Sequence, residues 1–185
     1  MKRKTIAALI AVLTVGMSTS VWAAPSISQI IPEAPVVVSG NLTGGQTLVV
    51  TNVNTNAYKD TTVAEVVKKA NDDNTVTTVK EILTELKVDT KKEEIKTTTG
   101  TKVNPTLYEQ VTPFVDLAIK EGDKTTLEST GAITATITVE AVKEMEKKDV
   151  LLMQIDPSTG KVFFIAPEKL DKATGEITAT FQTLG

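Results

Sequence analysis

Apolar residues in this chain change their spacing twice, and this change constrains the fold more than any other feature of the sequence. In residues 132–139 every second residue is apolar and threonines stand between them, as in a strand that buries one face. From residue 63 to residue 86 apolar residues recur at intervals of three and four, which is the spacing of amphipathic helices. Beyond residue 111 the strand spacing returns. The sequence therefore predicts an α+β fold, mainly an antiparallel β-sandwich with a small two- to three-helix insertion at about residues 62–111.

The insertion is expected to hold two short helices and a further helical turn. Thr61 or Thr62 would cap the first helix, whereas Thr78 and Glu81 form a capping-box motif at the start of the second. The residues expected to face inward are Val63, Val66, Val67 and Ala70 in the first helix, and Val79, Ile82, Leu83 and Leu86 in the second. The segment 104–111 begins with Asn-Pro, a cap followed by a proline that suits the first helical position.

Extended segments flank the insertion on both sides. They are residues 27–31, 36–39 and 46–53 before it, and 112–120, 132–139, 150–155, 162–166 and 177–181 after it. Residues 150–155 are apolar on both faces, as in an interior strand. This order predicts a signal peptide (1–23), N-terminal strands with the helical insertion (24–111) and a C-terminal sandwich portion (112–185), and a single continuous domain over 24–185 is the open alternative.

The first 23 residues have the three parts of a secretory signal. A basic stretch at residues 2–4 precedes an apolar run at 6–17, and a more polar stretch ends in Val-Trp-Ala, an A-x-A-like cleavage site. Because Pro25 disfavours cleavage after Ala24, we expect cleavage after Ala23. A membrane anchor is the alternative, but a bilayer span needs about 20 apolar residues, which is more than this run supplies. The sequence thus predicts a secreted, extracellular or cell-wall-associated protein with no membrane insertion after signal removal.

The sequence contains neither cysteine nor histidine, which excludes several kinds of chemistry. Ser-His-Asp and Cys-His catalysis, zinc sites built on these residues, thiol redox chemistry and iron–sulfur clusters all need them. An exported chain without disulfides depends on packing alone, which suits a bacterial protein. Removal of residues 1–23 takes away three of the 20 basic residues and none of the 23 acidic ones, so the mature formal charge is −6. A nucleic-acid partner is therefore not expected.

A D-x-x-T-G motif occurs twice, at residues 156–160 and 171–175. In such a turn the aspartate accepts hydrogen bonds from backbone N–H groups, and the glycine takes a positive φ. This structural role accounts for the motif without a bound ion. The polar run at residues 71–74 could offer oxygen ligands to calcium, but it lacks the spacing, glycine and glutamate of an EF-hand loop. We therefore expect a turn there, and no cofactor or metal site.

Two C-terminal segments are similar in sequence to a known class of protein module. They are residues 149–165, with the sequence DVLLMQIDPSTGKVFFI, and residues 171–181. They resemble β-sandwich modules in exported surface proteins of Gram-positive, clostridial-type gut bacteria. The resemblance covers about the last fifty residues and implies a stalk, adhesion or ligand-binding part with no catalytic residues to carry over. The chain differs from a surface-anchored protein because it has no sorting motif. It ends at Gly185 directly after an expected strand, so the alternative that it is a fragment of a larger protein stays open.

Paired carboxylates are the candidates for catalysis, and glycoside hydrolysis is the reaction that they could serve. The pairs are Asp72 with Asp73, Glu93 with Glu94, and Glu144 with Glu146. They lie in polar charge runs without the aromatic or apolar surroundings that such sites need. No catalytic, cofactor-binding or metal residue is therefore assigned.

Threonine is the most unusual compositional bias of the chain. Rows of hydroxyls are expected on the solvent faces of two strands, formed by Thr134, Thr136, Thr138, Thr178 and Thr180. They form either a flat polar binding surface or a soluble strand face, and the second is favoured. The aromatic side chains are expected in the core rather than beside a ligand, namely Tyr58, Tyr108, Phe114, Phe163, Phe164 and Phe181.

Taken together, these features predict an exported, non-catalytic bacterial module that is structural or binds an extracellular protein or glycan in an adhesion-like role. The identity of its partner is unknown. The alternative function is a carboxylate-dependent enzyme that acts on cell wall or polysaccharide.

Overall fold

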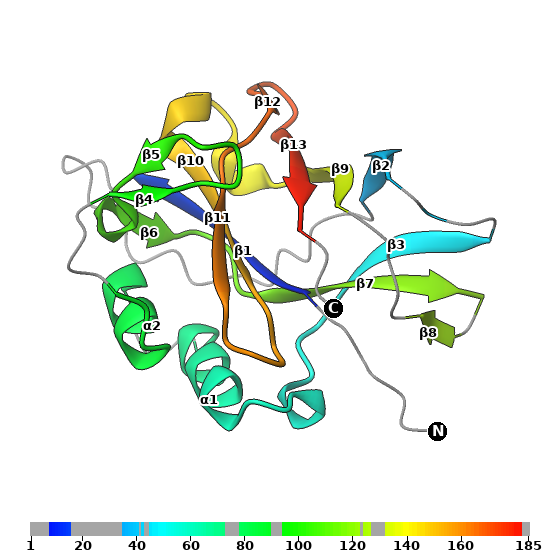
Figure 1. Ribbon diagram of the computed structural model, residues 1–185. Helices are drawn as coiled ribbons and strands as arrows, with labels where there is room; N and C mark the ends of the chain where they lie inside the picture. Colours follow the sequence, from blue (N-terminus) through cyan, green and yellow to red (C-terminus); the bar gives the residue numbers. More distant parts are fainter. Residues whose placement is uncertain are drawn as a thin grey trace.

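The computed structural model describes residues 8–15, 35–40, 42, 45–72, 78–89, 94–122, 124–126 and 132–182. Most of the elements in these ranges are antiparallel strands, and two short α-helices accompany them. The fold is α+β and sandwich-like, as the spacing of apolar residues predicts. Figure 1 shows the strands crossing the centre of the molecule, with both helices on one side of them.

The large sheet has seven strands, and its main path runs in the order β11-β10-β1-β7-β3. Two further strands extend it, because β6 pairs with β1 and β8 pairs with β7. The bounds are β1 Ala8–Val15, β3 Gln46–Thr51, β6 Tyr108–Gln110, β7 Val115–Glu121, β8 Lys124–Thr126, β10 Val150–Ile155 and β11 Val162–Ile165. All the pairings in this sheet are antiparallel.

A second sheet of four strands has the order β12-β13-β9-β2, and a two-stranded hairpin joins β4 to β5. The bounds are β2 Val36–Ser39, β4 Ile95–Lys96, β5 Lys102–Val103, β9 Ile133–Thr138, β12 Lys169–Asp171 and β13 Glu176–Phe181. Short 3-10 helices occupy Thr55–Ala57 (η1), Pro105–Leu107 (η2), Glu140–Val142 (η3) and Lys147–Asp149 (η4). In β9 and β13, buried residues alternate with half-buried threonines, as the sequence predicts.

Buried residues form two clusters, one on each face of the large sheet. On β10, Val150 and Leu152 belong to the cluster shared with the four-stranded sheet, whereas Leu151 and Met153 belong to the cluster shared with the helices. The large sheet is thus the middle of three layers. All six residues of β10 are buried, which confirms the interior strand expected over residues 150–155.

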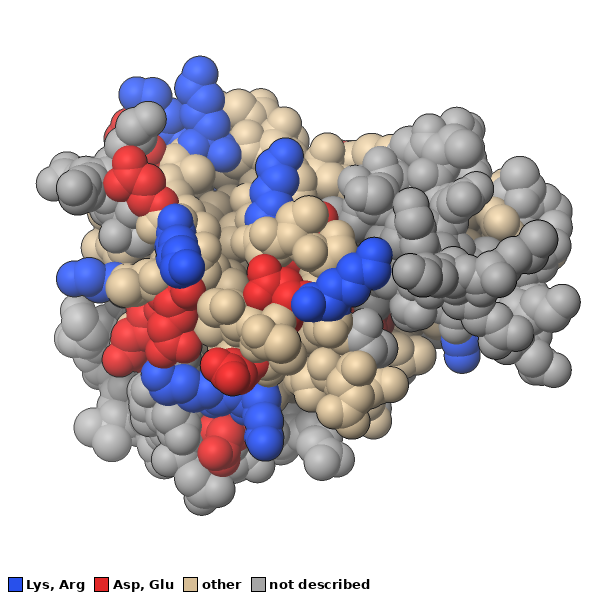
Figure 2. Space-filling view, turned by 60° about the horizontal axis from the view of Figure 1, so that its bottom comes forward, with Lys and Arg blue, Asp and Glu red and all other residues tan. Residues whose placement is uncertain are grey.

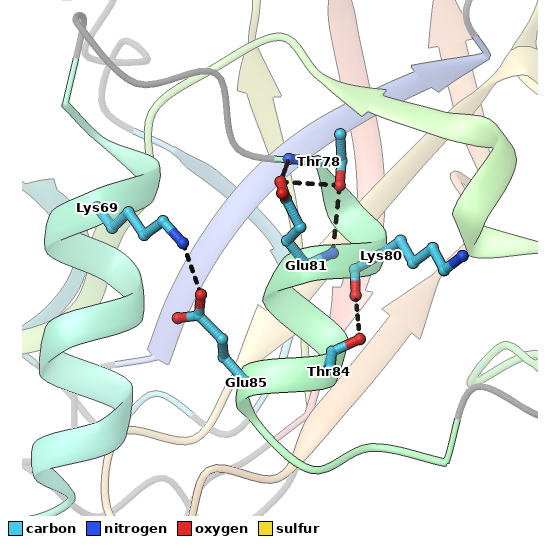
Figure 3. A network of polar contacts seen from close by, with 6 residues as sticks. All are labelled: Lys69, Thr78, Lys80, Glu81, Thr84 and Glu85. Atoms are coloured by element: carbon cyan, nitrogen blue, oxygen red, sulfur yellow. Dashed lines mark hydrogen bonds and ion pairs between the residues drawn. The ribbon is translucent and has the colours of Figure 1, made fainter.

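The helices α1 (Thr61–Ala70) and α2 (Val79–Glu85) cover the second face of the large sheet. The capping box of α2 is present as predicted: Thr78 N donates to Glu81 Oε2 at 2.8 Å, and Glu81 N donates to Thr78 Oγ1 at 3.2 Å. Lys69 of α1 forms an ion pair with Glu85 of α2 at 2.6 Å, and Figure 3 shows both contacts. The predicted inward residues of both helices are buried, except Leu86, which is half-buried.

Three local predictions differ from the structure. Asp60, not Thr61 or Thr62, caps α1, because its carboxylate accepts hydrogen bonds from two backbone N–H groups and suits the positive end of the helix dipole. The helical turn expected through Val111 ends at Leu107, since the following residues pair with β1 as strand β6. The strand expected from residue 112 begins at Val115. The strand expected at residues 27–31 lies outside the described residues.

Strand β1 occupies an interior position, whereas the sequence predicts a signal peptide there. Residues 8–15 belong to the apolar run of the predicted signal peptide, and in this structure they are part of the folded chain. In this chain they lie between β10 on one side and β6 and β7 on the other. The blue strand across the middle of Figure 1 shows this placement.

Candidate functional site

A groove of about 300 Å³ lies beside β11, the edge strand of the large sheet. Strand β4 and the turn that follows it form another wall of the groove, and Thr98 N in this turn donates to Phe164 O at 2.8 Å. We call it the β11 groove; its lining residues are Val88, Ile95, Lys96, Thr97, Thr98, Val162, Phe163, Phe164 and Gln182. Three parts of the chain that are distant in sequence therefore meet at this site.

The lining of the β11 groove combines an apolar floor with several polar groups. The ring of Phe163 is half-buried, and the ammonium of Lys161 lies 4.8 Å from its centroid. Lys96 and Thr98 are exposed at the rim. The main chain of Gln182 is held by Gln154, whose amide donates to Gln182 O at 2.8 Å and accepts from Gln182 N at 3.0 Å. An aromatic ring beside hydroxyl, amide and ammonium groups is suited to a polar ligand that has one apolar face.

The β11 groove does not bring carboxylates together. Its described lining residues include no aspartate or glutamate, so these residues supply no acid–base pair. Two of the lining residues, Phe163 and Phe164, are among the aromatic residues that the sequence predicts in the core; Phe164 is buried and Phe163 is half-buried. Only the tertiary pairing of distant segments forms the groove, and the one local indication is the lysine two positions before Phe163 at the start of an edge strand.

The most strongly perturbed titratable groups lie elsewhere, at the start of β7. The carboxylate of Asp116 is buried, and it accepts a hydrogen bond from Tyr58 Oη at 2.8 Å and one from Asn54 N at 3.1 Å. Burial raises the pKa of Asp116, although both hydrogen bonds oppose this shift. Burial, followed by the charge and hydrogen bond of Asp116, also raises the pKa of Tyr58, which keeps the phenol protonated. Both oxygens of the carboxylate are engaged, so this pair joins η1 to the large sheet.

Replacing Tyr58 by phenylalanine is expected to lower the free energy of unfolding by about 1–3 kcal/mol at neutral pH, because Asp116 loses a charge-stabilising donor. The pKa of Asp116 should rise further. When folding raises the pKa of a carboxyl group, its protonated form stabilises the folded state at pH values below its ordinary pKa, which is 3.8 for Asp116. This stabilisation is lost as the pH rises through the raised pKa of the folded state. The cost of the substitution should therefore grow between acid and neutral pH, as measured by urea unfolding.

Tyr108→Phe is the matched control for this prediction. Tyr108 Oη donates to the backbone carbonyl of Lys148 at 3.3 Å rather than to a carboxylate, so the cost of its removal should not vary with pH. A cost for Tyr58→Phe that stays constant between acid and neutral pH would contradict the role assigned to its hydroxyl.

The two D-x-x-T-G motifs form the turns that the sequence predicts. Asp156 Oδ1 accepts from Ser158 N at 2.8 Å, its Oδ2 accepts from Thr159 Oγ1 at 2.6 Å, and Gly160 has a φ of 70°. Burial alone would raise the pKa of Asp156, but the hydrogen bonds from Thr159 and Ser158 outweigh it and hold the pKa below its usual value. Asp171 accepts from the backbone of its own turn, and Gly175 has a φ of 75°. In both turns the aspartate acts as a cap.

The acidic residues weighed for catalysis lie on the surface wherever the structure describes them. Glu146 pairs with Lys172, and Glu94 pairs with Lys102 at 3.1 Å. Glu144 is exposed, and Asp73 and Glu93 lie outside the described residues. Over the described ranges, acidic side chains form no group of three or more that could hold a metal ion. Figure 2 shows basic and acidic side chains beside one another on one face of the molecule.

Asn71, considered above as part of a polar turn, has a structural role that the sequence does not indicate. Its amide group donates to Phe114 O at 2.9 Å and accepts from Phe114 N at 2.7 Å. This double contact joins the end of α1 to the residue that precedes β7. The second half of the run, residues 73–74, lies outside the described residues.

The threonine rows of β9 and β13 are paired across the strands. Thr134 Oγ1 lies 2.6 Å from Thr180 Oγ1, and Thr136 Oγ1 lies 2.8 Å from Thr178 Oγ1. The hydroxyls therefore hydrogen-bond to each other, as expected of cross-strand pairs that stabilise a sheet. The aromatic side chains are mostly buried, as expected, while Tyr58 and Phe163 are half-buried.

Comparisons with known proteins find no matching family model, no matching curated protein and no matching solved structure. Within the part of the chain that the structure describes, no helix has the length and apolar character needed to cross a membrane.

Proposed function

We propose that the protein is an exported bacterial module that binds a glycan in the β11 groove and does not catalyse a reaction. The observation that carries this proposal is the composition of the lining, in which the half-buried ring of Phe163 lies with Lys96, Thr98 and Gln182. A sugar ring presents an apolar face and a hydroxyl edge, so it matches an aromatic side chain surrounded by hydrogen-bonding groups.

Three further observations support the proposal. The N-terminal sequence has the pattern of a secretory signal, which would bring the protein into contact with extracellular glycans. The C-terminal segments resemble exported surface modules that bind or connect other molecules. The described lining residues of the groove include no carboxylate, so a bound sugar would meet binding groups rather than an acid–base pair.

The test is a glycan-array screen, followed by titration calorimetry with the best glycan. Phe163→Ala is expected to weaken binding at least about ten-fold, and Lys96→Ala about three- to ten-fold, since each removes one contact worth roughly 1 kcal/mol or more. Lys169→Ala is the matched control, because this exposed lysine on β12 is not part of the groove. The affinity of the Lys169→Ala variant for the glycan should equal that of the unmodified protein.

Two results would overturn the proposal. One is glycan binding that survives Phe163→Ala and Lys96→Ala together while the variant remains folded. The other is turnover of a polysaccharide that one Asp or Glu substitution abolishes, because this would make the protein an enzyme.

A further inference from the structure

Strand β1 is paired along both of its edges, although it comes from the predicted signal peptide. On one side its residues from Leu9 to Thr14 pair with β10. On the other side its first half pairs with β7 and its second half pairs with β6. Between these two partners, Val12 N donates to Thr112 Oγ1 at 2.9 Å, and Val12 O accepts from Val111 N at 2.9 Å. The strand is therefore held by hydrogen bonds of the kind that hold any interior strand.

Both faces of β1 are buried. Ile10 and Val12 belong to the cluster between the large sheet and the four-stranded sheet, and each is 2% exposed. Ala11 and Leu13 belong to the cluster under the helices and are 1% and 0% exposed. All four of these buried side chains are apolar. The place that β1 fills is thus a narrow apolar position with a hydrogen-bonding edge on each side, which we call the β1 slot.

Cleavage after Ala23 would empty the β1 slot. Because neighbouring strands lie about 4.8 Å apart, β10 would then face β7 and β6 across about 9.5 Å with no strand between them. Two rows of backbone N–H and C=O groups would lose their partners, as would the buried hydroxyl of Thr112. Unpaired edges and bare apolar side chains of this kind strongly favour the addition of a new strand.

Both walls of the slot are fixed by contacts that do not involve β1. On one side β10 pairs with β11, and Gln154 joins it to Gln182 after β13. On the other side β7 pairs with β3, and the residue before it, Phe114, is bound to Asn71 at the end of α1. Each wall is therefore tied to the rest of the fold by contacts that do not depend on β1.

We propose that the mature protein is a strand acceptor, in which the β1 slot takes an extended apolar segment of a second polypeptide. The proposal rests on the processing step of the proposed function but not on glycan binding. The occupant runs antiparallel to β10, as β1 does. Its chemistry follows from the burial of β1: apolar residues at the positions of Ile10, Val12 and Leu13, and a small one at that of Ala11. A charged residue at any of the four positions would be buried without a partner.

The test uses the full chain with a specific protease site placed between residues 16 and 23. After cutting, β1 can be exchanged in mild urea for a labelled synthetic peptide of residues 8–15, and binding is followed by fluorescence anisotropy. The control peptide carries Ala11→Asp and Leu13→Asp. We expect the labelled peptide to bind at one per chain and the control peptide to bind at least about a hundred-fold more weakly. Thr112→Val in the protein should weaken peptide binding about three- to ten-fold, because Val12 N loses its acceptor.

Several outcomes would overturn strand acceptance. One is a cut chain that releases β1, keeps its stability and binds neither peptide, because β10 has then closed directly onto β7. Another is equal binding of the labelled peptide and the control peptide, which would show that the peptides bind nonspecifically and not as a strand in the slot. A third is a cut chain that unfolds once β1 leaves and is not restored by the peptide.

A separate measurement tests the processing step. The mass of the protein recovered from the culture medium should lack residues 1–23, and the protein should bind the labelled peptide. A mass that retains residues 1–23 refutes processing even if the cut chain accepts the peptide, so the two failures are distinguishable. In that case β1 would be a permanent strand, and the slot would never open.

Discussion

Gly175→Ala is expected to lower the free energy of unfolding by about 3–5 kcal/mol, even though the three residues before this glycine are exposed. Gly175 has a φ of 75°, which costs an alanine about 1–2 kcal/mol. An added Cβ would also lie 2.5 Å from the carbonyl oxygen of Val139, which is backbone and cannot rotate away. The carbonyl of Gly175 accepts from Val139 N at 2.9 Å, so relief of the clash would disturb the pairing of β9 with the start of β13.

Gly160→Ala is a close control, because the two glycines hold the same position in the two D-x-x-T-G turns. Its φ is 70°, but an added Cβ would lie 3.5 Å from its nearest atoms, on Asp60 and Val63, which is an ordinary contact. Only the backbone conformation should be costly, at about 1–2 kcal/mol. Urea unfolding of both variants measures the difference. Equal losses in the free energy of unfolding would show that the contact of the added Cβ with Val139 does not destabilise the protein.

Leu83→Ala is expected to lower the free energy of unfolding by about 2–5 kcal/mol, because it leaves a cavity under α2. Leu83 is 0% exposed and packs in the cluster that α1 and α2 share with the large sheet. Thr84→Ala on the same helix is the control. Thr84 is exposed, and its loss should cost no more than about 0.5 kcal/mol. Thermal or urea unfolding measures both costs. If Leu83→Ala leaves the free energy of unfolding nearly unchanged, α2 does not pack on the sheet as described.

The spacing of apolar residues was enough to predict β9, β13 and both helices, because each has a regular pattern, and the short apolar run of residues 150–155 before a turn motif was enough to predict β10. It could not assign β1, since a run of apolar residues satisfies the pattern of a signal peptide and that of an interior strand equally well. The decision between the two depends on whether an empty position exists in the sheet. Only the pairing of β10, β6 and β7 reveals that position.

The candidate site was harder to predict than the fold, because distant segments form it. Phe163 and Lys96 are far apart in the sequence and meet only because the β4–β5 hairpin lies against β11. Asp116 was not singled out, although a lone charge within the apolar run of residues 114–119 is a usable indication of a buried polar contact. The partner Tyr58 could not have been inferred in the same way, because half-buried aromatic residues carry no such local pattern.

The pairing of β1 with β10 also has a consequence for the timing of folding. Leu9 pairs with Ile155, so a strand made at the start of synthesis must wait for one made near its end. At about 5–20 residues per second, the ribosome needs roughly 7–30 s to reach that partner. Contacts of such high sequence separation also form slowly once both strands exist. During this interval one edge of β1 lacks its partner β10, although β6 and β7, which pair with its other edge, are made earlier. If the protein is exported as we propose, the incomplete sheet would leave the N-terminal segment accessible while the chain is still being made.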